Sequence, residues 1–244
     1  MLALFHTLVY QPMYNALALL VGVVPGGDVG IAIIILTLLI KFILFPLSIK
    51  AVRTQVAMRE IEPELKRIRE TFKDKREDLA RATMALFKEK KVNPFASILL
   101  IIIQIPVILG LYYVFLVEGR GNGFDPALLY SFIPPPGGAS LLFLGFLDLT
   151  GKSVILAAVV AVTQYMYARF MPPPAKKESG AAPSLQEDLM RSMHLQMRYV
   201  FPIVFGFVAY YISAAVALYF VVSNLFALAQ ELYVKRFRPP HGTV

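Results

Sequence analysis

A single lysine, Lys41, lies within an otherwise apolar stretch that runs from Val29 to Ile49. As a helix this stretch would be about 31 Å long, enough to cross the hydrocarbon of a bilayer. Lys41 would lie roughly 13 Å from the end at Lys50, too far for its side chain to bring the ammonium to the headgroups. A charge at that depth is unfavourable unless it faces water or a partner. Lys41 therefore indicates a hydrated cavity, and a lysine that snorkels to a nearby helix end is the alternative.

Polar residues within the apolar stretches recur at helical spacing. Three sets follow the spacing i, i+4 and i+11: Thr37, Lys41 and Ser48; Asn93, Ser97 and Gln104; and Tyr219, Ser223 and Gln230, with Asn224 adjacent. Each set occupies one face of its helix. If the three faces converge, they line a wet trough around Lys41. A lone polar residue such as Thr163 or Ser48 more often bridges two helices by a hydrogen bond, so only the set with a charge favours the trough.

No catalytic arrangement accompanies Lys41. With Thr37 one turn away it could act as a general base, but the sequence has no oxyanion loop, phosphate-binding glycine loop or paired carboxylates beside it. Glu231 lies close to a span end, whereas a coupled ion transporter usually needs an acid within the membrane. The chain has no cysteine, and its three histidines lack metal-ligand spacing. We therefore predict no enzyme, no metal and no cofactor.

The composition is that of an integral membrane protein. Of the 244 residues, 57% are hydrophobic and 16% charged, and the mean hydropathy is +0.64. These values exclude an ordinary soluble domain. The net charge of +8 would suggest nucleic acid in a soluble protein. Here it favours loops that face anionic lipid, or RNA beyond it, without direct nucleic-acid specificity.

We expect an all-α polytopic protein with five transmembrane helices. Their expected ranges are 29–50, 94–117, 152–170, 199–213 and 215–234. The fourth is short, and only Ser213-Ala214-Ala215 separates the fourth apolar run from the fifth, which predicts a tight hairpin. Residues 1–25 are expected to lie along the membrane surface as an interfacial helix, with a sixth span as the alternative. No cleaved signal peptide is predicted, because a basic n-region and a convincing cleavage site are missing.

The distribution of basic residues predicts the orientation. Segment 51–92 carries 12 Lys and Arg residues, whereas segment 118–151 carries only Arg120. The segment 171–198 and the tail after Tyr233 are also basic. With five spans, the N-terminus outside and the C-terminus inside, all the basic segments fall on the cytoplasmic side. A sixth span would move the N-terminus alone, so this distribution does not exclude it.

Segment 51–92 is expected to form an antiparallel helical hairpin in the cytoplasm. Two apolar faces support it: Ile61, Leu65, Ile68 and Phe72 in one helix, and Leu79, Thr83, Leu86 and Phe87 in the other. Pro63 predicts a kink or a restart with proline in the first turn. The charged surface is either merely solvated or a docking surface for lipid headgroups, ribosome or other translocation partners.

Segment 171–198 is expected to be a cytosolic loop. It opens with Pro172-Pro173-Pro174 and a small, polar run, which is typical of a linker. Ser184 and Glu187 form a plausible capping box, and the helix that follows would place Met190, Met193 and Met197 along one side. That side either rests on the membrane or the first hairpin, or adapts to varied apolar partners.

Three runs of the sequence together resemble the YidC/Oxa/Alb family of membrane protein insertases. They are KFILFPLSIKAVRTQVAMREIEPELKRIR, KVNPFASILLIIIQIPVILGLYY and ALYFVVSNLFALAQ. The features that match jointly are Lys41 five residues before Pro46, the Val92-Asn93-Pro94 start, Gln104 two residues before Pro106, and Ser223-Asn224. The resemblance covers essentially the whole chain in the same order.

The resemblance implies a function and the residues that perform it. It implies five transmembrane helices around a hydrophilic groove that is open to the cytoplasm and lipid, and it implies no nucleotide hydrolysis. The groove would receive the polar tail of a nascent membrane protein, whose spans then move into the bilayer. The implied groove residues are Lys41, Thr37, Gln104, Ser223 and Asn224, and the implied client contacts are Tyr219 and Phe220. A ribosome and a Sec translocon would be further partners, with anionic lipid.

The chain departs from the family pattern in three ways. Its groove charge is lysine where many relatives carry arginine, so a point charge replaces a bidentate donor. We expect no large extracytoplasmic domain before the first span, and the short tail after Tyr233 disfavours strong ribosome docking. The bacterial plasma membrane is the expected location, because we find no organellar transit segment. A small-solute transporter or channel is the alternative function, and a structural membrane scaffold is another.

Overall fold

The structure is a computed structural model that describes residues 2–73, 75–93, 95–118, 124–170, 192 and 195–236. Most of the described chain is helical, as predicted. The elements are α1 (Leu2–Phe5), η1 (His6–Tyr10), α2 (Gln11–Val23), η2 (Pro25–Gly27), α3 (Val29–Glu60), α4 (Glu62–Thr71), α5 (Arg76–Glu89), α6 (Phe95–Glu118), η3 (Pro126–Leu128), β1 (Leu142–Phe143), β2 (Leu147–Asp148), α7 (Val154–Phe170), η4 (Gln196–Val200), α9 (Phe201–Ile212) and α10 (Ala214–Arg236). The all-helical prediction misses one feature, the two-stranded antiparallel sheet of β1 and β2.

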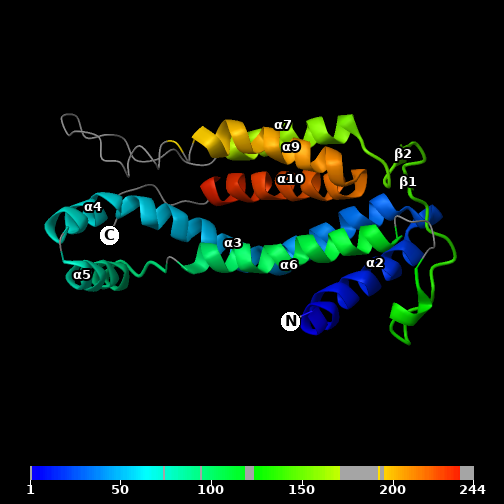
Figure 1. Cartoon of the computed structure of the whole chain (residues 1–244), viewed down its shortest axis with the longest axis horizontal. Coiled ribbons are helices and arrows are strands. Elements are labelled where there is room, and N and C mark those ends of the chain that lie inside the picture. The colour runs from blue at the N-terminus through cyan, green and yellow to red at the C-terminus, as the bar shows by residue number, and fades with distance from the viewer. Residues whose placement is uncertain are drawn as a thin grey trace.

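The long helices form two groups that meet at α10. α7 packs against α9 and α10, and α10 in turn packs against α3. α3 also packs against α6 and α2. Figure 1 shows the pair α4 and α5 at one end of this bundle, called here the hairpin end, and β1 and β2 at the other, called the sheet end. By length and composition alone, α3 and α10 are the two described helices that could each cross a membrane.

Single residues, Ser213 and Ile61, separate two pairs of consecutive helices at positions where the sequence predicts a turn or a break. Ser213 alone, in an extended conformation, separates α9 from α10, so the predicted tight hairpin is shorter than the three residues expected. α3 ends at Glu60, and α4 begins at Glu62 with Pro63 in its first turn. Proline is compatible with that position because the first N–H groups of a helix have no partner within it. The chain therefore starts a new helix at Glu62, with Pro63 in its first turn, as the alternative of a restart predicts.

The helical pair α4 and α5 has a small core of its own. Ile61, which immediately precedes α4, and Leu65 of α4 pack in one cluster with Leu86 of α5 and Val92. An exposed ion pair joins Lys90 Nζ to Glu64 Oε1 at 2.7 Å, and it raises the pKa of Lys90.

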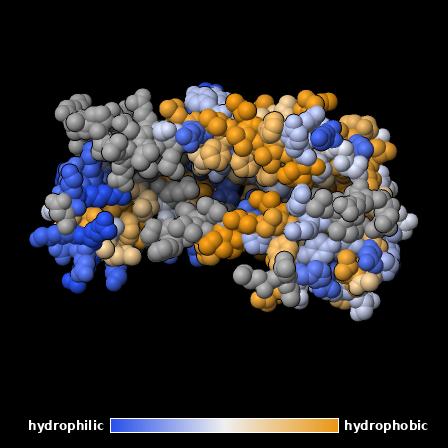
Figure 2. Space-filling model, in the orientation of Figure 1, coloured by the Kyte–Doolittle hydropathy of each residue, from blue (hydrophilic) through white to orange (hydrophobic). Residues whose placement is uncertain are grey.

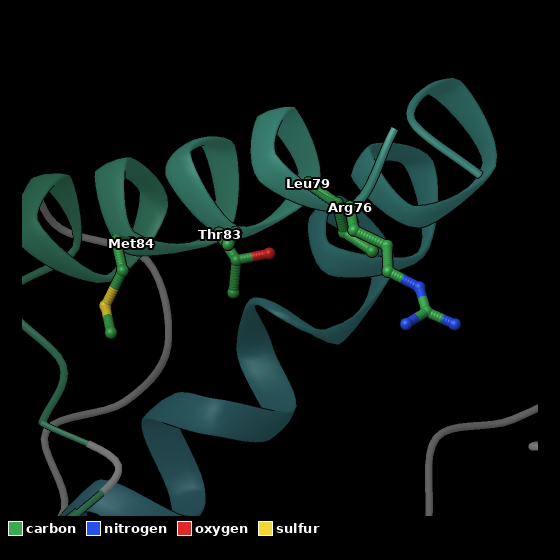
Figure 3. A pocket seen from close by; sticks show the side chains of 5 residues that line it. Arg76, Leu79, Thr83 and Met84 are labelled. Atoms are coloured by element: carbon green, nitrogen blue, oxygen red, sulfur yellow. The ribbon is translucent and has the colours of Figure 1, made fainter. Parts of the chain in front are cut away.

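The second face predicted for the hairpin does not lie wholly in that core. Leu79 and Thr83 instead line a shallow surface hollow with Arg76, Ala80 and Met84, all from α5 (Figure 3). Spacing alone does not distinguish Leu79 from Leu86, because both lie on one face of α5, but only Leu86 is buried in the small core.

At the sheet end, Asp28 joins the start of α3 to the turn between β1 and β2. Its Oδ1 accepts hydrogen bonds from the N–H groups of Gly30 at 2.8 Å and Ile31 at 3.1 Å, which caps α3. Its Oδ2 accepts one from the Leu144 N–H at 2.7 Å. The neighbouring glycine allows the loop to approach, since a Cβ at Gly27 would lie 2.2 Å from the Gly138 carbonyl oxygen.

Buried polar side chains of α2 attach the loop that precedes the sheet. Asn15 Nδ2 donates to the Leu128 carbonyl oxygen at 2.9 Å, and Asn15 Oδ1 accepts from the Tyr130 N–H at 2.6 Å. The hydroxyl of Tyr14 accepts from the Asp125 N–H at 2.6 Å. Because Asn15 is 1% exposed and Tyr14 is fully buried, these bonds hold the loop over the sheet end of the bundle.

The packing of α7 against α9 depends on one glycine, which gives the first prediction. A Cβ at Gly206 would lie 3.0 Å from the Cβ of Ala161 and 3.1 Å from the carbonyl oxygen of Ala157. Gly206→Val should therefore lower the free energy of unfolding by about 1–3 kcal/mol through overpacking. Thermal melting in detergent micelles, followed by circular dichroism, measures the change.

Gly22 of α2 provides the matched control, because a Cβ there would meet no atom within 4 Å. Gly22→Val carries the same change in helix propensity without the contact. If the two variants melted at the same temperature, the close approach of α7 and α9 would not depend on Gly206.

Candidate functional site

Three polar residues from three helices form a connected row. Lys41 Nζ of α3 donates a hydrogen bond to Gln104 Oε1 of α6 at 3.3 Å. Gln104 Nε2 donates in turn to the hydroxyl of Tyr219 on α10. These three residues, called here the polar row, lie 63 and 115 positions apart in sequence. The structure thus brings together one member of each of the three predicted polar faces.

The charge of Lys41 is only weakly compensated within the row. Its acceptor is a neutral amide, and no carboxylate in the described part of the chain is recorded as an ion-pair partner of Lys41. Lys41 is half-buried, whereas Tyr219 is 2% exposed. The row therefore presents an ammonium whose acceptor could be replaced by a carboxylate, because a charged acceptor forms a stronger hydrogen bond than an amide.

A second polar contact joins α3 to α10 nearer the hairpin end. Ser48 Oγ donates to Gln230 Oε1 at 2.7 Å. Aromatic rings accompany it along the same boundary: Phe226 contacts Phe42 and Phe45, with centroids 5.3 and 6.1 Å apart. The two helices are therefore held together over several turns, and this boundary is closed.

Thr37 and Asn224, expected to line the trough, have partners away from Lys41. Thr37 is 1% exposed, and its hydroxyl donates to the Ile33 carbonyl oxygen of its own helix at 2.7 Å. Asn224 Nδ2 donates to Thr163 Oγ1 of α7 at 3.2 Å. Asn224 thus bridges two helices, the alternative role that isolated polar residues have in membrane bundles.

The remaining predicted residues of α10 are buried. Phe220 packs against Phe205 of α9, with ring centroids 5.5 Å apart and perpendicular planes. Ser223 is 8% exposed, and its hydroxyl has no well-formed hydrogen bond within the described part of the chain. It lies one helical turn from Tyr219, on the side of α10 that carries the polar row.

A hollow lies between the two groups of helices. α6 packs mainly against α3, with smaller contacts to η1, α2 and α10, and α9 packs mainly against α7, so α6 and α9 are not extensively packed together in the described part of the chain. In Figure 2 this region is a depression with hydrophilic surface at its floor and hydrophobic surface on its rims. A polar floor between apolar rims can hold a polar segment that is attached to an apolar one.

The sequence patterns did not predict the hydrogen bonds by which Asp28 and Asn15 attach the loops at the sheet end. An aspartate immediately before a long apolar run is an N-cap signal and could have identified Asp28. No signal in the sequence could have identified Asn15, because its partners are backbone groups more than 100 residues away.

The chain is similar to known proteins over most of its length. Residues 20–241 match the model of a family described as 60Kd inner membrane protein. A protein of Burkholderia vietnamiensis is 32% identical over 232 residues, which are 94% of this chain and 36% of that protein. One of Clostridium tetani is 31% identical over 218 residues, 89% of this chain and 86% of that protein. Both carry the name membrane protein insertase YidC, and the chain spans about a third of the length of the first.

Proposed function

Because the chain belongs to the YidC/Oxa/Alb family, represented by the 60Kd inner membrane protein model, we propose that it inserts nascent membrane proteins into the bilayer. One observation carries the proposal: the polar row of Lys41, Gln104 and Tyr219 joins α3, α6 and α10, helices from both groups of the bundle. The client's polar tail enters the hollow and meets Lys41, and its apolar span lies against the rim. The protein catalyses no covalent reaction.

Lys41 receives the tail by electrostatic attraction. A carboxylate of the client displaces Gln104 Oε1 from the ammonium, and Gln104 keeps its contact with Tyr219. Ammonium and water lower the free energy of bringing a polar tail to this depth. The attraction is moderate because lysine offers a point charge rather than a bidentate fork, which allows the client to leave.

The span leaves on the side where α6 and α9 are not extensively packed together. The opposite boundary, between α3 and α10, is closed by Ser48–Gln230 and by the rings around Phe226. Asn224, Thr37 and Phe220 support this arrangement as structural residues of the walls.

The membrane arrangement belongs to the proposal. α3, α6, α7, α9 and α10 are the five spans, with the N-terminus outside and the C-terminus inside, and the hairpin end lies in the cytoplasm. The covered sheet end then closes the groove to the outside. The membrane potential assists the outward movement of an acidic tail by roughly 2.3 kcal/mol per charge per 100 mV. Ribosome, Sec translocon and anionic lipid are the partners we expect at the cytoplasmic side.

Site-specific photocrosslinking tests the path of the client. The chain has no cysteine or tryptophan, and photoreactive residues can be placed at 41, 104 and 219. We expect each to crosslink to the tail of a ribosome-stalled membrane protein that carries an acidic tail. Ile155, 75% exposed near the sheet end of α7, is the control position and should not crosslink to the tail. Equal crosslinking from 155 and 41 would show that the tail does not enter the hollow.

A further inference from the structure

Arg198 is a half-buried cation with no acceptor in the described part of the chain. It lies in η4, the turn that leads into α9. Its Nε is buried without a hydrogen-bond partner, and none of the described carboxylates pairs with it. A buried guanidinium nitrogen without an acceptor is unfavourable. Because Nε has almost no accessible surface, an acceptor from outside the described chain would meet the other two guanidinium nitrogens of this half-buried side chain.

The surroundings of Arg198 place it where apolar helices end. Tyr199 contacts Tyr165 of α7, with ring centroids 6.2 Å apart, so η4 lies beside the last turns of α7. α7 ends at Phe170, after the exposed Arg169. Tyrosine and arginine side chains at the end of apolar helices are typical of the headgroup level of a bilayer. Lipid phosphates lie at that level.

The shape of the site favours a lipid over a free anion. The ring of Tyr199 is 5.7 Å from the guanidinium carbon of Arg198 and shields one side of it. Beside the cation in sequence, Met197 is 40% exposed and offers an apolar surface. The planar guanidinium matches the geometry of phosphate oxygens. A ligand with a phosphate and an attached hydrocarbon chain satisfies both features.

We propose that Arg198 binds the phosphate of an anionic phospholipid, whose acyl chain lies against Met197. The lipid occupies the angle between η4 and the last turns of α7, at the hairpin end of the bundle. Anionic lipid is concentrated in the cytoplasmic leaflet, which agrees with the orientation proposed above. The binding site itself does not depend on insertase activity, because no residue of the polar row takes part.

Lipid retention measures the site directly. Wild-type protein and variants are purified in detergent, mixed with phosphatidylglycerol, and analysed by native mass spectrometry. We expect Arg198→Gln to weaken retention of the tightest-bound lipid by about tenfold or more, as loss of a charge-assisted bond does. Arg198→Lys should retain an intermediate affinity, since it keeps the charge without the fork.

Three controls make the result decisive. Arg169→Gln, at an exposed arginine one turn after Tyr165, should retain the lipid as the wild type does. Phosphatidylcholine should bind more weakly than phosphatidylglycerol in the wild type only, and inorganic phosphate should not displace the lipid. Equal retention by wild type and Arg198→Gln would overturn the proposal. Displacement by inorganic phosphate would also overturn it, because the site would then bind a free anion.

Discussion

Lys41→Glu is expected to slow the insertion of clients with acidic tails by about tenfold or more. A carboxylate about 5 Å from Lys41 is attracted by roughly 3 kcal/mol at an effective dielectric constant of 20, and the variant replaces this attraction with repulsion. Water in the hollow weakens both values, so the expected change is smaller than their sum. Proteoliposomes that contain equal amounts of each variant, with a client whose inserted tail becomes protected from protease, provide the measurement.

Variants at Lys41 separate charge from geometry. Lys41→Arg should retain insertion, because the charge is kept and Gln104 can still accept a hydrogen bond. Lys41→Gln should give an intermediate rate, since attraction is lost without repulsion. Lys50→Glu is the matched control. Lys50 is exposed and directly follows the same apolar stretch, so reversal of its charge should change the insertion rate little.

The client's charge provides a second, independent comparison. A client whose tail carries lysines in place of its acids should insert through the Lys41→Glu variant at least as fast as through the wild type. Normal insertion of acidic-tailed clients by Lys41→Glu would contradict the role proposed for Lys41. A structural scaffold, in which Lys41 could be replaced freely, would predict that outcome.

The helices could be predicted from the sequence because the apolar stretches are long and bounded by charges or by Pro and Gly. The start of α3 follows Pro25-Gly26-Gly27-Asp28, and the restart at Pro63 follows from the missing N–H of proline. The arrangement of the helices in space could not be predicted in the same way. Helical spacing gives the face on which a residue lies but not the helix that this face contacts.

The polar row illustrates the same limit. Lys41, Gln104 and Tyr219 were each placed on a polar face, and these three faces do meet. Asn224 follows Ser223 directly, so it projects about 100° around α10 and reaches Thr163 of α7 instead. Thr37 lies on the same face of α3 as Lys41, but its hydroxyl donates to the Ile33 carbonyl oxygen one turn earlier, as threonine in a helix commonly does.

The polar row is bounded on two sides by parts of the molecule that are firmly attached. The polar row lies between a closed boundary, formed by α3 and α10, and a sheet end covered by loop 124–153. The backbone N–H groups of Ala214 and Ala215, where α10 begins, bond to the carbonyl oxygens of Gly151 at 2.9 Å and Leu149 at 3.1 Å. The same loop thus contacts α2, α3 and α10, and its attachments hold the ends of those helices together.

Asp28→Ala is expected to have the largest effect on the stability of the sheet end. The carboxylate is 7% exposed and accepts hydrogen bonds from three backbone N–H groups, at Gly30, Ile31 and Leu144. Loss of a helix cap lowers the free energy of unfolding by about 0.5–2 kcal/mol. A further charge-assisted bond contributes about 1.5–3 kcal/mol, so a total of roughly 2–5 kcal/mol is expected. Thermal melting in micelles measures the total.

Asp28→Asn separates the two attachments that the carboxylate makes. The amide oxygen of asparagine can still accept from Gly30 and Ile31, but its NH₂ group cannot accept from the Leu144 N–H. Hydrogen exchange should therefore become faster at Leu144 in both variants, and faster at Gly30 and Ile31 only in Asp28→Ala. Unchanged exchange at Leu144 in Asp28→Asn would show that the turn between β1 and β2 is held without Asp28. Since Asp28 caps the helix that carries Lys41, loosening of this cap should also reduce insertion in Asp28→Ala while Lys41 itself is unaltered.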